Sequence, residues 1–271
     1  MKKILLSLMF ITVISSVEIE AQTIFIPQPP VINIPLLDPS RMIIQNEVIR
    51  NTTSGEAGKG KKGASTNVPK AIDYTVFTES QENVVPKILA RGVKGSAESQ
   101  LKSEAFFDAQ IDMYKRTADY HKYPANDVAF AYVYFVSNTY EIYKDLVTVP
   151  LEKDPWAKRA KDGFERISLM NLKKISKIMP GQDKAMYFQF KEMLSAKPEF
   201  KKLSDLEKQK MTETLAIKFG VLYVDYMKAI ESEDQSAIND AHEAAKRGFE
   251  ELLNMPIDKV EFSYEAGVRV K

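Results

Sequence analysis

The sequence of 271 residues contains no cysteine. Disulfide bonds, thiolate catalysis, iron–sulfur clusters, cysteine-based zinc sites and the lipid-modified cysteine of a bacterial lipoprotein are therefore excluded. Histidine is scarce as well, with only His121 and His242 present. Neither belongs to a His-x-x-x-His pair, and neither follows a glutamate by three residues as in a helical di-iron site. We expect no metal and no cofactor, and both histidines at the surface or at helix ends.

An excess of charge of one sign is also missing. Lys and Arg number 38 and Asp and Glu number 37, so the formal net charge is only +1. A balanced chain has no general electrostatic attraction to nucleic acid, and we expect no nucleic-acid partner. Beyond residue 21 no apolar run approaches the roughly 18 residues of a membrane helix. We therefore expect no transmembrane span in the mature chain.

The common catalytic motifs are missing too. The chain has no Gly-x-Ser-x-Gly elbow and no Ser-x-x-Lys with its usual companion motifs. It also lacks a glycine-rich loop between a strand and a helix, the arrangement that binds phosphates. These absences favour a protein that is not an enzyme.

Residues 1–21 have the pattern of a secretory signal peptide. Lys2 and Lys3 precede an almost uninterrupted apolar run from Ile4 to Val17, and Ala21 precedes a plausible cleavage point. The apolar run is shorter than the about 20 residues that span a bilayer. The pattern predicts an exported protein, either periplasmic or secreted.

Two segments of different composition follow. Residues 22–50 are apolar but contain Pro27, Pro29, Pro30, Pro35 and Pro39. Proline at this density excludes a helix and predicts an extended segment. We expect it to pack across its own domain, or alternatively to dock into a groove or sheet edge of an envelope protein. Residues 51–70 are rich in Gly, Ser and Lys and predict a flexible linker.

The remaining residues, 71–271, predict an all-α domain. Their apolar periodicity indicates a single bundle of about five to seven helices. Short alternating segments at Ile72–Phe77, Val260–Tyr264 and Val268–Val270 are expected as minor strands. The predicted helices are Pro86–Gly92, Ala97–His121, Val128–Leu146, 155–179, Asp183–Leu194, one from Asp205 past Ile230, and one that Asp234 caps and that ends near Pro256.

Capping residues and glycines refine these helices. Asn126 is expected as the N-cap before Val128, Asp154 as the N-cap before Pro155, and Ser204 with Glu207 as a capping box. The helix from Val128 is apolar on most sides, which predicts a central position in the bundle. Gly220 lies inside a long helix, which indicates the close approach of a neighbouring helix.

Helix 97–121 carries an acidic row and an apolar stripe. Glu104, Asp108 and Asp112 recur at four-residue intervals and therefore share one face. A solvated outer face is the main interpretation. Carboxylates of a hydrolase, one with a raised pKa, are the alternative. Leu101, Phe106, Met113 and Tyr120 are expected along the apolar stripe of this helix.

Tyrosine is concentrated in one region. The sequence has 12 tyrosines, and most of them lie between Tyr114 and Tyr143. Tyrosine combines a flat apolar face with a hydroxyl, so it serves either the margin of a helical core or a surface that binds small molecules and glycans. The candidate ligand-binding residues are Tyr120, Tyr123, Asn126 and Tyr134.

The segment Tyr123-Pro124-Ala125-Asn126-Asp127-Val128-Ala129 and its aromatic continuation to Tyr143 resemble a family of exported bacterial helical proteins of unknown function. The resemblance covers roughly Phe106 to Phe249 and implies no catalytic residue. Together these features predict an exported, non-enzymatic helical domain that binds a protein partner or ligand in the bacterial cell envelope. A hydrolase using Glu104, Asp108 or Asp112 and a small-molecule or glycan binder lined by Tyr and Phe are the alternatives.

Overall fold

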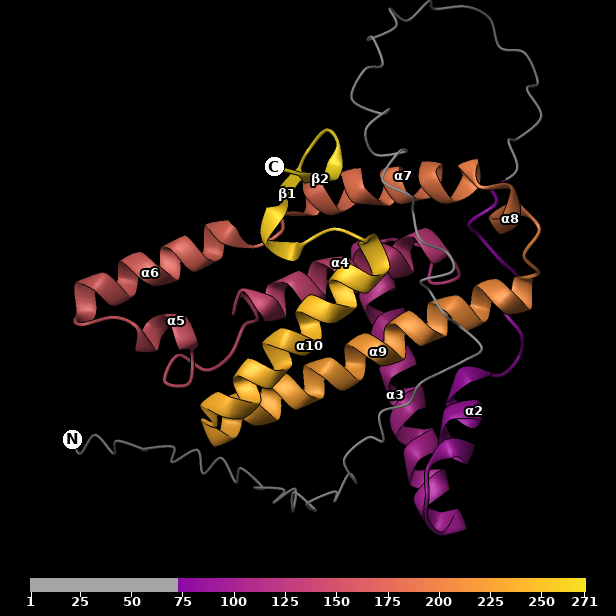
Figure 1. The fold of residues 1–271 in the computed structure, drawn as a ribbon, viewed down its shortest axis with the longest axis horizontal. Coiled ribbons are helices and arrows are strands. Elements are labelled where there is room, and N and C mark those ends of the chain that lie inside the picture. Colours follow the sequence, from indigo (N-terminus) through magenta and orange to yellow (C-terminus); the bar gives the residue numbers. More distant parts are fainter. Residues whose placement is uncertain (1–72) are drawn as a thin grey trace, which may run out of the picture. The chain divides into compact units, whose positions relative to one another are not determined.

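The computed structural model describes residues 73–271 (Figure 1). The predicted signal peptide (1–21), the proline-rich segment (22–50) and the linker (51–70) lie outside the described residues. The helices are α2 (Val85–Gly92), α3 (Ala97–His121), α4 (Val128–Tyr143), α5 (Pro155–Lys158), α6 (Gly163–Ser176), α7 (Pro180–Ala196), α8 (Pro198–Lys201), α9 (Asp205–Ser232) and α10 (Gln235–Leu253).

The prediction of an all-α fold with minor strands is confirmed. After α10 a 3-10 turn, η3 (Ile257–Lys259), leads into β1 (Val260–Ser263), which pairs antiparallel with β2 (Gly267–Val270). The strand predicted at Ile72–Phe77 is wrong, because within its described part only Val76 forms an isolated bridge, to Asp127. None of the helices between residues 73 and 271 is long and apolar enough to cross a membrane.

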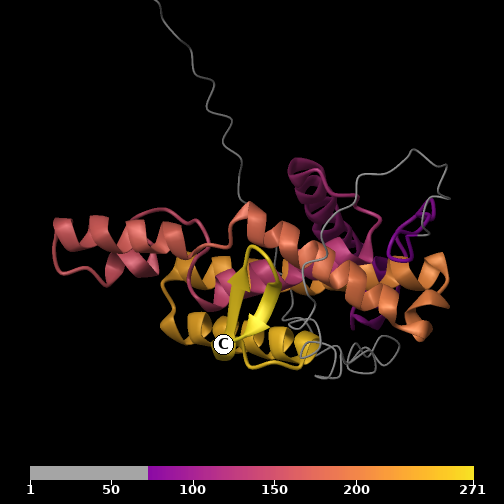
Figure 2. The ribbon, with the colours of Figure 1, turned by 90° about the horizontal axis from the view of Figure 1, so that it is seen from above.

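Helix α4 occupies the centre of the bundle, as its composition predicts. Twelve of its side chains are buried, and the helix packs against α7, α9 and α10. The ring of Tyr114 from α3 also reaches it, with its centroid 5.1 Å from that of Tyr134 and 5.6 Å from that of Phe130. Figures 1 and 2 show these helices surrounding α4. A helix apolar on all sides can be stable in water only when it is enclosed in this way.

The predicted N-cap of α4 is off by one residue. Asp127, not Asn126, caps the helix, with its carboxylate accepting a hydrogen bond from the Ala129 N–H at 2.8 Å. Asn126 is occupied elsewhere, because its side-chain amide donates to the Phe77 carbonyl at 2.6 Å. Asn and Asp are both strong caps, so the choice depends on this contact between residues far apart in sequence.

The apolar stripe predicted for α3 is also incorrect. Leu101 and Tyr120 are 67% and 79% exposed, and the buried face carries Phe107, Ile111 and Tyr114 instead. Both stripes follow helical spacing, one position apart, so periodicity alone does not distinguish them. Packing against α2 and α9 selects the buried one.

The single helix predicted for residues 155–179 is interrupted. Asp154 caps α5 as predicted by accepting from the Trp156 N–H at 2.9 Å. A second cap then begins α6, where the Asp162 carboxylate accepts from the Glu165 N–H at 2.8 Å. Local side-chain bonds of this kind compete with helix continuation without altering the apolar pattern. Pro180 begins α7 rather than ending the preceding helix.

Gly220 of α9 lies against α3, which confirms the predicted close approach. A Cβ added at Gly220 would lie 2.3 Å from Oε1 and 2.7 Å from Cβ of Gln110. Both distances are far below van der Waals contact, so only glycine allows α3 and α9 to pack at this separation.

We therefore expect Gly220→Ala to lower the free energy of unfolding by about 1–3 kcal/mol, as overpacked cores do. This loss opposes the about 1 kcal/mol that alanine would contribute to an unpacked helix. Thermal unfolding followed by circular dichroism measures the effect. The double variant Gly220→Ala/Gln110→Ala should recover part of the loss, and a single variant as stable as the parent would contradict the packing.

Candidate functional site

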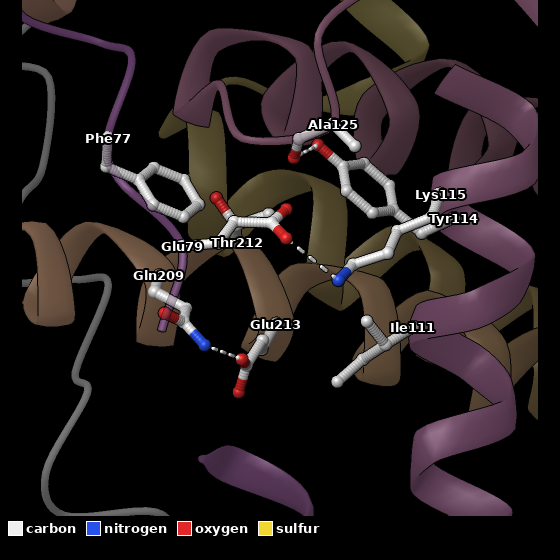
Figure 3. A pocket seen from close by; sticks show the side chains of 9 residues that line it. All are labelled: Phe77, Glu79, Ile111, Tyr114, Lys115, Ala125, Gln209, Thr212 and Glu213. Atoms are coloured by element: carbon white, nitrogen blue, oxygen red, sulfur yellow. Dashed lines mark hydrogen bonds and ion pairs between the residues drawn. The ribbon is translucent and has the colours of Figure 1, made fainter. Parts of the chain in front are cut away.

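A small pocket lies between α3, α9 and the segment that precedes α2 (Figure 3). It encloses about 230 Å³, including open solvent at its mouth. The space that the centre of a water-sized sphere can occupy is only about 10 Å³, so the pocket suits at most a single water molecule. The lining residues are Phe77, Glu79, Ile111, Tyr114, Lys115, Ala125, Gln209, Thr212 and Glu213.

The charged groups of the pocket are already paired. Glu213 is almost fully buried, and its carboxylate accepts hydrogen bonds from the backbone N–H groups of Val84 and Val85 at 2.9 and 2.7 Å. Gln209 donates to its other oxygen at 2.7 Å. At the mouth, Lys115 Nζ lies 3.2 Å from the Glu79 carboxylate. Glu213 thus holds the first turn of α2 against α9, and its carboxylate is satisfied.

The hydroxyl groups of the pocket differ from each other. Tyr114 donates to the Ala125 carbonyl at 2.9 Å, and burial holds the pKa of its phenol well above the usual value. Thr212 is 4% exposed, and its hydroxyl has no hydrogen-bond partner among the described residues. The walls of the pocket are mainly apolar, and the Thr212 hydroxyl is an unpaired polar group that a single bound water molecule could satisfy.

Sequence reasoning placed a candidate ligand surface close to this pocket, but on other side chains. Tyr120 is exposed, Tyr134 is buried with an unpaired hydroxyl, and Asn126 bonds to Phe77. Tyr123 is half-buried, and its ring stacks on Phe130 with centroids 4.8 Å apart. These four residues do not line a common pocket in the described part of the chain.

The polar residues of α9 that do line the pocket were missed. Residues 208–214 of α9 form a mostly polar stretch that is largely buried. The one available signal was the density of Gln, Thr and Glu beside Met211 and Leu215.

The acidic row of α3 lies on one helical face, as its spacing requires. Asp108 accepts a hydrogen bond from the Asn83 side chain at 2.9 Å and so helps to join α3 to the start of α2. Glu104 is half-buried and Asp112 is exposed. The three carboxylates line no pocket identified in residues 73–271.

A second polar cluster surrounds Asp145, just after α4. Asp145 is 4% exposed and has a positive φ of 56°, which is unusual for a residue other than glycine. Its carboxylate accepts from the Tyr226 hydroxyl at 3.1 Å, contacts His242 Nε2 at 2.8 Å and pairs with Arg159 at 2.6 Å. The cluster therefore joins the end of α4 to α9, α10 and the segment after α5.

His242 is thus not at the surface or a helix end, as predicted, but half-buried within α10. An aspartate that orients a histidine is one part of a general-base dyad. No serine or threonine hydroxyl among the described residues bonds to His242. Burial and the neighbouring Asp145 raise the pKa of Tyr226, which keeps this phenol neutral. The cluster is suited to cross-linking helices rather than to nucleophilic chemistry.

Three described carboxyl groups have raised pKa values, those of Glu141, Asp183 and Asp225. Burial is the main cause for Glu141 of α4 and for Asp183 of α7, and the negative charge of Asp183 adds to the effect at Glu141. The Ser137 hydroxyl donates to Asp183 at 2.6 Å, which opposes the rise there. Raised carboxyl pKa values also mark catalytic acids, but a pocket is needed beside them, and none is identified here within residues 73–271.

The remaining feature is an exposed apolar surface on residues 151–180, which we call the α5–α6 arm. Phe164 is 82% exposed, and Ile167, Leu172 and Ile175 are also exposed on α6. The opposite side of α6 is fixed by Lys173, whose ammonium lies 2.6 Å from the buried Asp154 carboxylate and 2.8 Å from the Val147 carbonyl. The helix therefore has a fixed orientation, with its most apolar side chains turned to solvent.

No group of three or more His, Asp or Glu side chains in residues 73–271 is placed to hold a metal ion. The arrangements in this part of the chain therefore offer two polar clusters that cross-link helices, one water-sized pocket, and one exposed apolar helix face.

Comparison with known proteins finds a match to one family over part of the chain. Residues 181–267 match DUF6683, a family of unknown function. The match includes α7, α9 and α10 and leaves the α5–α6 arm outside. It confirms the resemblance to an uncharacterised family, although it overlaps the predicted range of 106–249 only from residue 181. No curated protein and no solved structure matches the chain.

For the pocket we expect Glu213→Leu to lower the free energy of unfolding by about 2–5 kcal/mol, because buried N–H groups of Val84 and Val85 lose their acceptor. Thr212→Val should be neutral or slightly stabilising, since it removes an unpaired buried hydroxyl. Chemical denaturation of both variants measures these changes. A large loss in Thr212→Val would instead indicate that the hydroxyl binds something in the pocket.

Because the pKa of the Glu141 carboxyl group is raised, we expect Glu141→Gln to increase the free energy of unfolding at pH 7. An acid whose pKa is raised on folding destabilises the native state once it is ionised, and this penalty disappears below its unfolded pKa. The advantage of the variant should therefore shrink as the pH falls towards the ordinary glutamate pKa. Unfolding midpoints across pH test this, with Glu251→Gln, an exposed change on α10, as the control. A pH-independent difference between Glu141→Gln and the parent would contradict the assignment.

Proposed function

We propose that this chain is an exported, non-enzymatic helical domain that binds a component of the bacterial cell envelope through the α5–α6 arm. The observation that carries the proposal is the apolar face of α6, on which Phe164 and Ile175 are 82% and 68% exposed. Single exposed apolar residues are common on protein surfaces, but grouped ones mark interaction sites. The export part rests on the signal-peptide pattern of residues 1–21.

The isolation of α6 within the fold supports this role. Its extensive contacts within residues 73–271 are with α5, and Figures 1 and 2 show it away from α3 and α8. The side chains on its outer face therefore contribute little to the core. Their apolar character has a physical use only if another surface covers them.

The state of the polar clusters favours binding over catalysis. Glu213 and Asp145 each receive several hydrogen bonds from the protein itself. A catalytic carboxylate needs an oxygen left for its substrate, together with a space for that substrate. Both groups instead hold helices together.

The test is retention of the full mature chain by its own cell-envelope fraction. Phe164→Gln/Ile167→Gln should reduce the retained fraction at least tenfold, because it removes apolar surface from α6. Glutamine is chosen because it has a high helix propensity. Phe188→Gln is the matched control, since Phe188 is 56% exposed on α7, outside the arm. Equal retention of the arm variant and the parent would overturn the proposal.

A further inference from the structure

We infer that the envelope component bound by the α5–α6 arm is the anionic surface of a lipid bilayer. This inference rests on the proposed function and names its partner. Helix α6 has 14 residues, so it is about 21 Å long and too short to span the roughly 30 Å hydrocarbon core. In the inferred complex it lies in the plane of the interface, with Phe164, Ile167, Leu172 and Ile175 among the lipid chains.

The outer face of α6 has the geometry that such a helix needs. At about 100° per residue, Phe164, Ile167, Leu172 and Ile175 fall within a sector of about 140°. Lys173 lies on the opposite side, buried against Asp154. The four apolar side chains therefore share one side of the helix with the polar Ser168 and Asn171, and the buried ion pair turns this side to solvent.

The charge of the arm is complementary to an anionic surface. Residues 151–180 contain eight Lys and Arg and four Asp and Glu, a net charge of +4, whereas the whole chain has +1. The rest of the chain therefore carries −3. The positive charge is concentrated in the same segment that exposes the apolar side chains.

Part of this positive charge is available to a partner. Lys153, Lys158 and Arg159 pair with Glu231, Glu233 and Asp145, in that order. In contrast, Lys161, Arg166 and Lys174 form no ion pair with any residue between 73 and 271. Lys177, just after α6, donates to the Thr148 hydroxyl at 2.8 Å and also interacts electrostatically with the Glu141 carboxylate. Lysine and arginine around an apolar helix face are typical of interfacial helices that bind anionic lipids.

The form of the surface favours a bilayer over a peptide or a protein helix. Proteins that bind a single helix or an extended peptide usually enclose it in a groove. Here the exposed element is itself a single helix with α5 as its main neighbour. A flat, deformable partner can cover such a convex strip without further structure.

The test uses the full mature chain and extruded vesicles. One set is pure phosphatidylcholine, and the other contains about 30% phosphatidylglycerol as the anionic lipid. Flotation measures binding. Trp156, the only tryptophan, lies in α5 and reports the approach of brominated lipids through fluorescence quenching. We expect binding to the anionic vesicles at least tenfold above the neutral ones, quenching of Trp156, and a strong loss in about 0.5 M salt.

Three variants locate the interaction. Phe164→Gln/Ile167→Gln should abolish binding and quenching, and Lys161→Gln/Lys174→Gln should lower the anionic preference at least fivefold. Phe188→Gln should bind like the parent. Thermal unfolding is measured for each, and all three should melt like the parent because the substituted side chains are exposed. This series also separates the arm from the apolar residues 22–50, which are the same in every variant.

The outcomes separate the inference from the proposed function. If the chain ignores anionic vesicles but stays in the envelope fraction through Phe164 and Ile167, the partner is a protein and only the inference is overturned. Equal binding to neutral and anionic vesicles overturns the anionic preference. If the chain does not bind vesicles but forms a concentration-dependent dimer that the α6 variants abolish, the apolar face binds a second copy of the chain and the inference is overturned. If the parent chain neither binds anionic vesicles nor stays in the envelope fraction, both the inference and the proposed function are overturned.

Discussion

The fold depends on the enclosure of α4. Its sequence leaves no polar face, so water must be excluded from nearly its whole circumference, and α7, α9 and α10 pack along it. Aromatic rings fill much of the interface. The ring centroids of Tyr132 and Phe190 are 5.5 Å apart, and those of Tyr134 and Phe219 are 5.0 Å apart. Such large side chains supply much of the apolar area that stabilises a core without disulfides.

Enclosing α4 also buries its two ends, and this accounts for the polar clusters. At the start, Asp127 is fully buried and accepts from the Ala129 N–H and from the Tyr187 hydroxyl at 2.6 Å. After the end, Asp145 is satisfied by side chains of α9 and α10 and by Arg159. Buried carboxylates need several such partners to offset the cost of leaving water. The resemblance of Asp145 and His242 to a catalytic dyad thus has a structural origin.

Local chemistry made part of this structure predictable. The all-α class, the limits of α3, the capping box at Ser204 and the role of Gly220 follow from short-range signals. The break between α5 and α6 comes from a local cap at Asp162, whereas the other failures depend on contacts between distant residues. Asn126 is displaced as a cap by its bond to Phe77, and no pattern within α9 or α10 indicates that Thr212 lies at a pocket or that His242 meets Asp145.

The α5–α6 arm shows why burial cannot be inferred from apolar character alone. Phe164 and Ile175 have the spacing of core residues, yet the polar Lys173 faces inward to Asp154. A buried ion pair contributes little net stability compared with an apolar pair of the same volume. Its effect is on the orientation of the helix. Rotating α6 to bury Phe164 would move the Lys173 ammonium away from Asp154 and leave the Asp154 carboxylate unpaired in the interior. The ion pair thus selects the orientation in which the apolar face meets solvent, and that orientation makes the face available for binding.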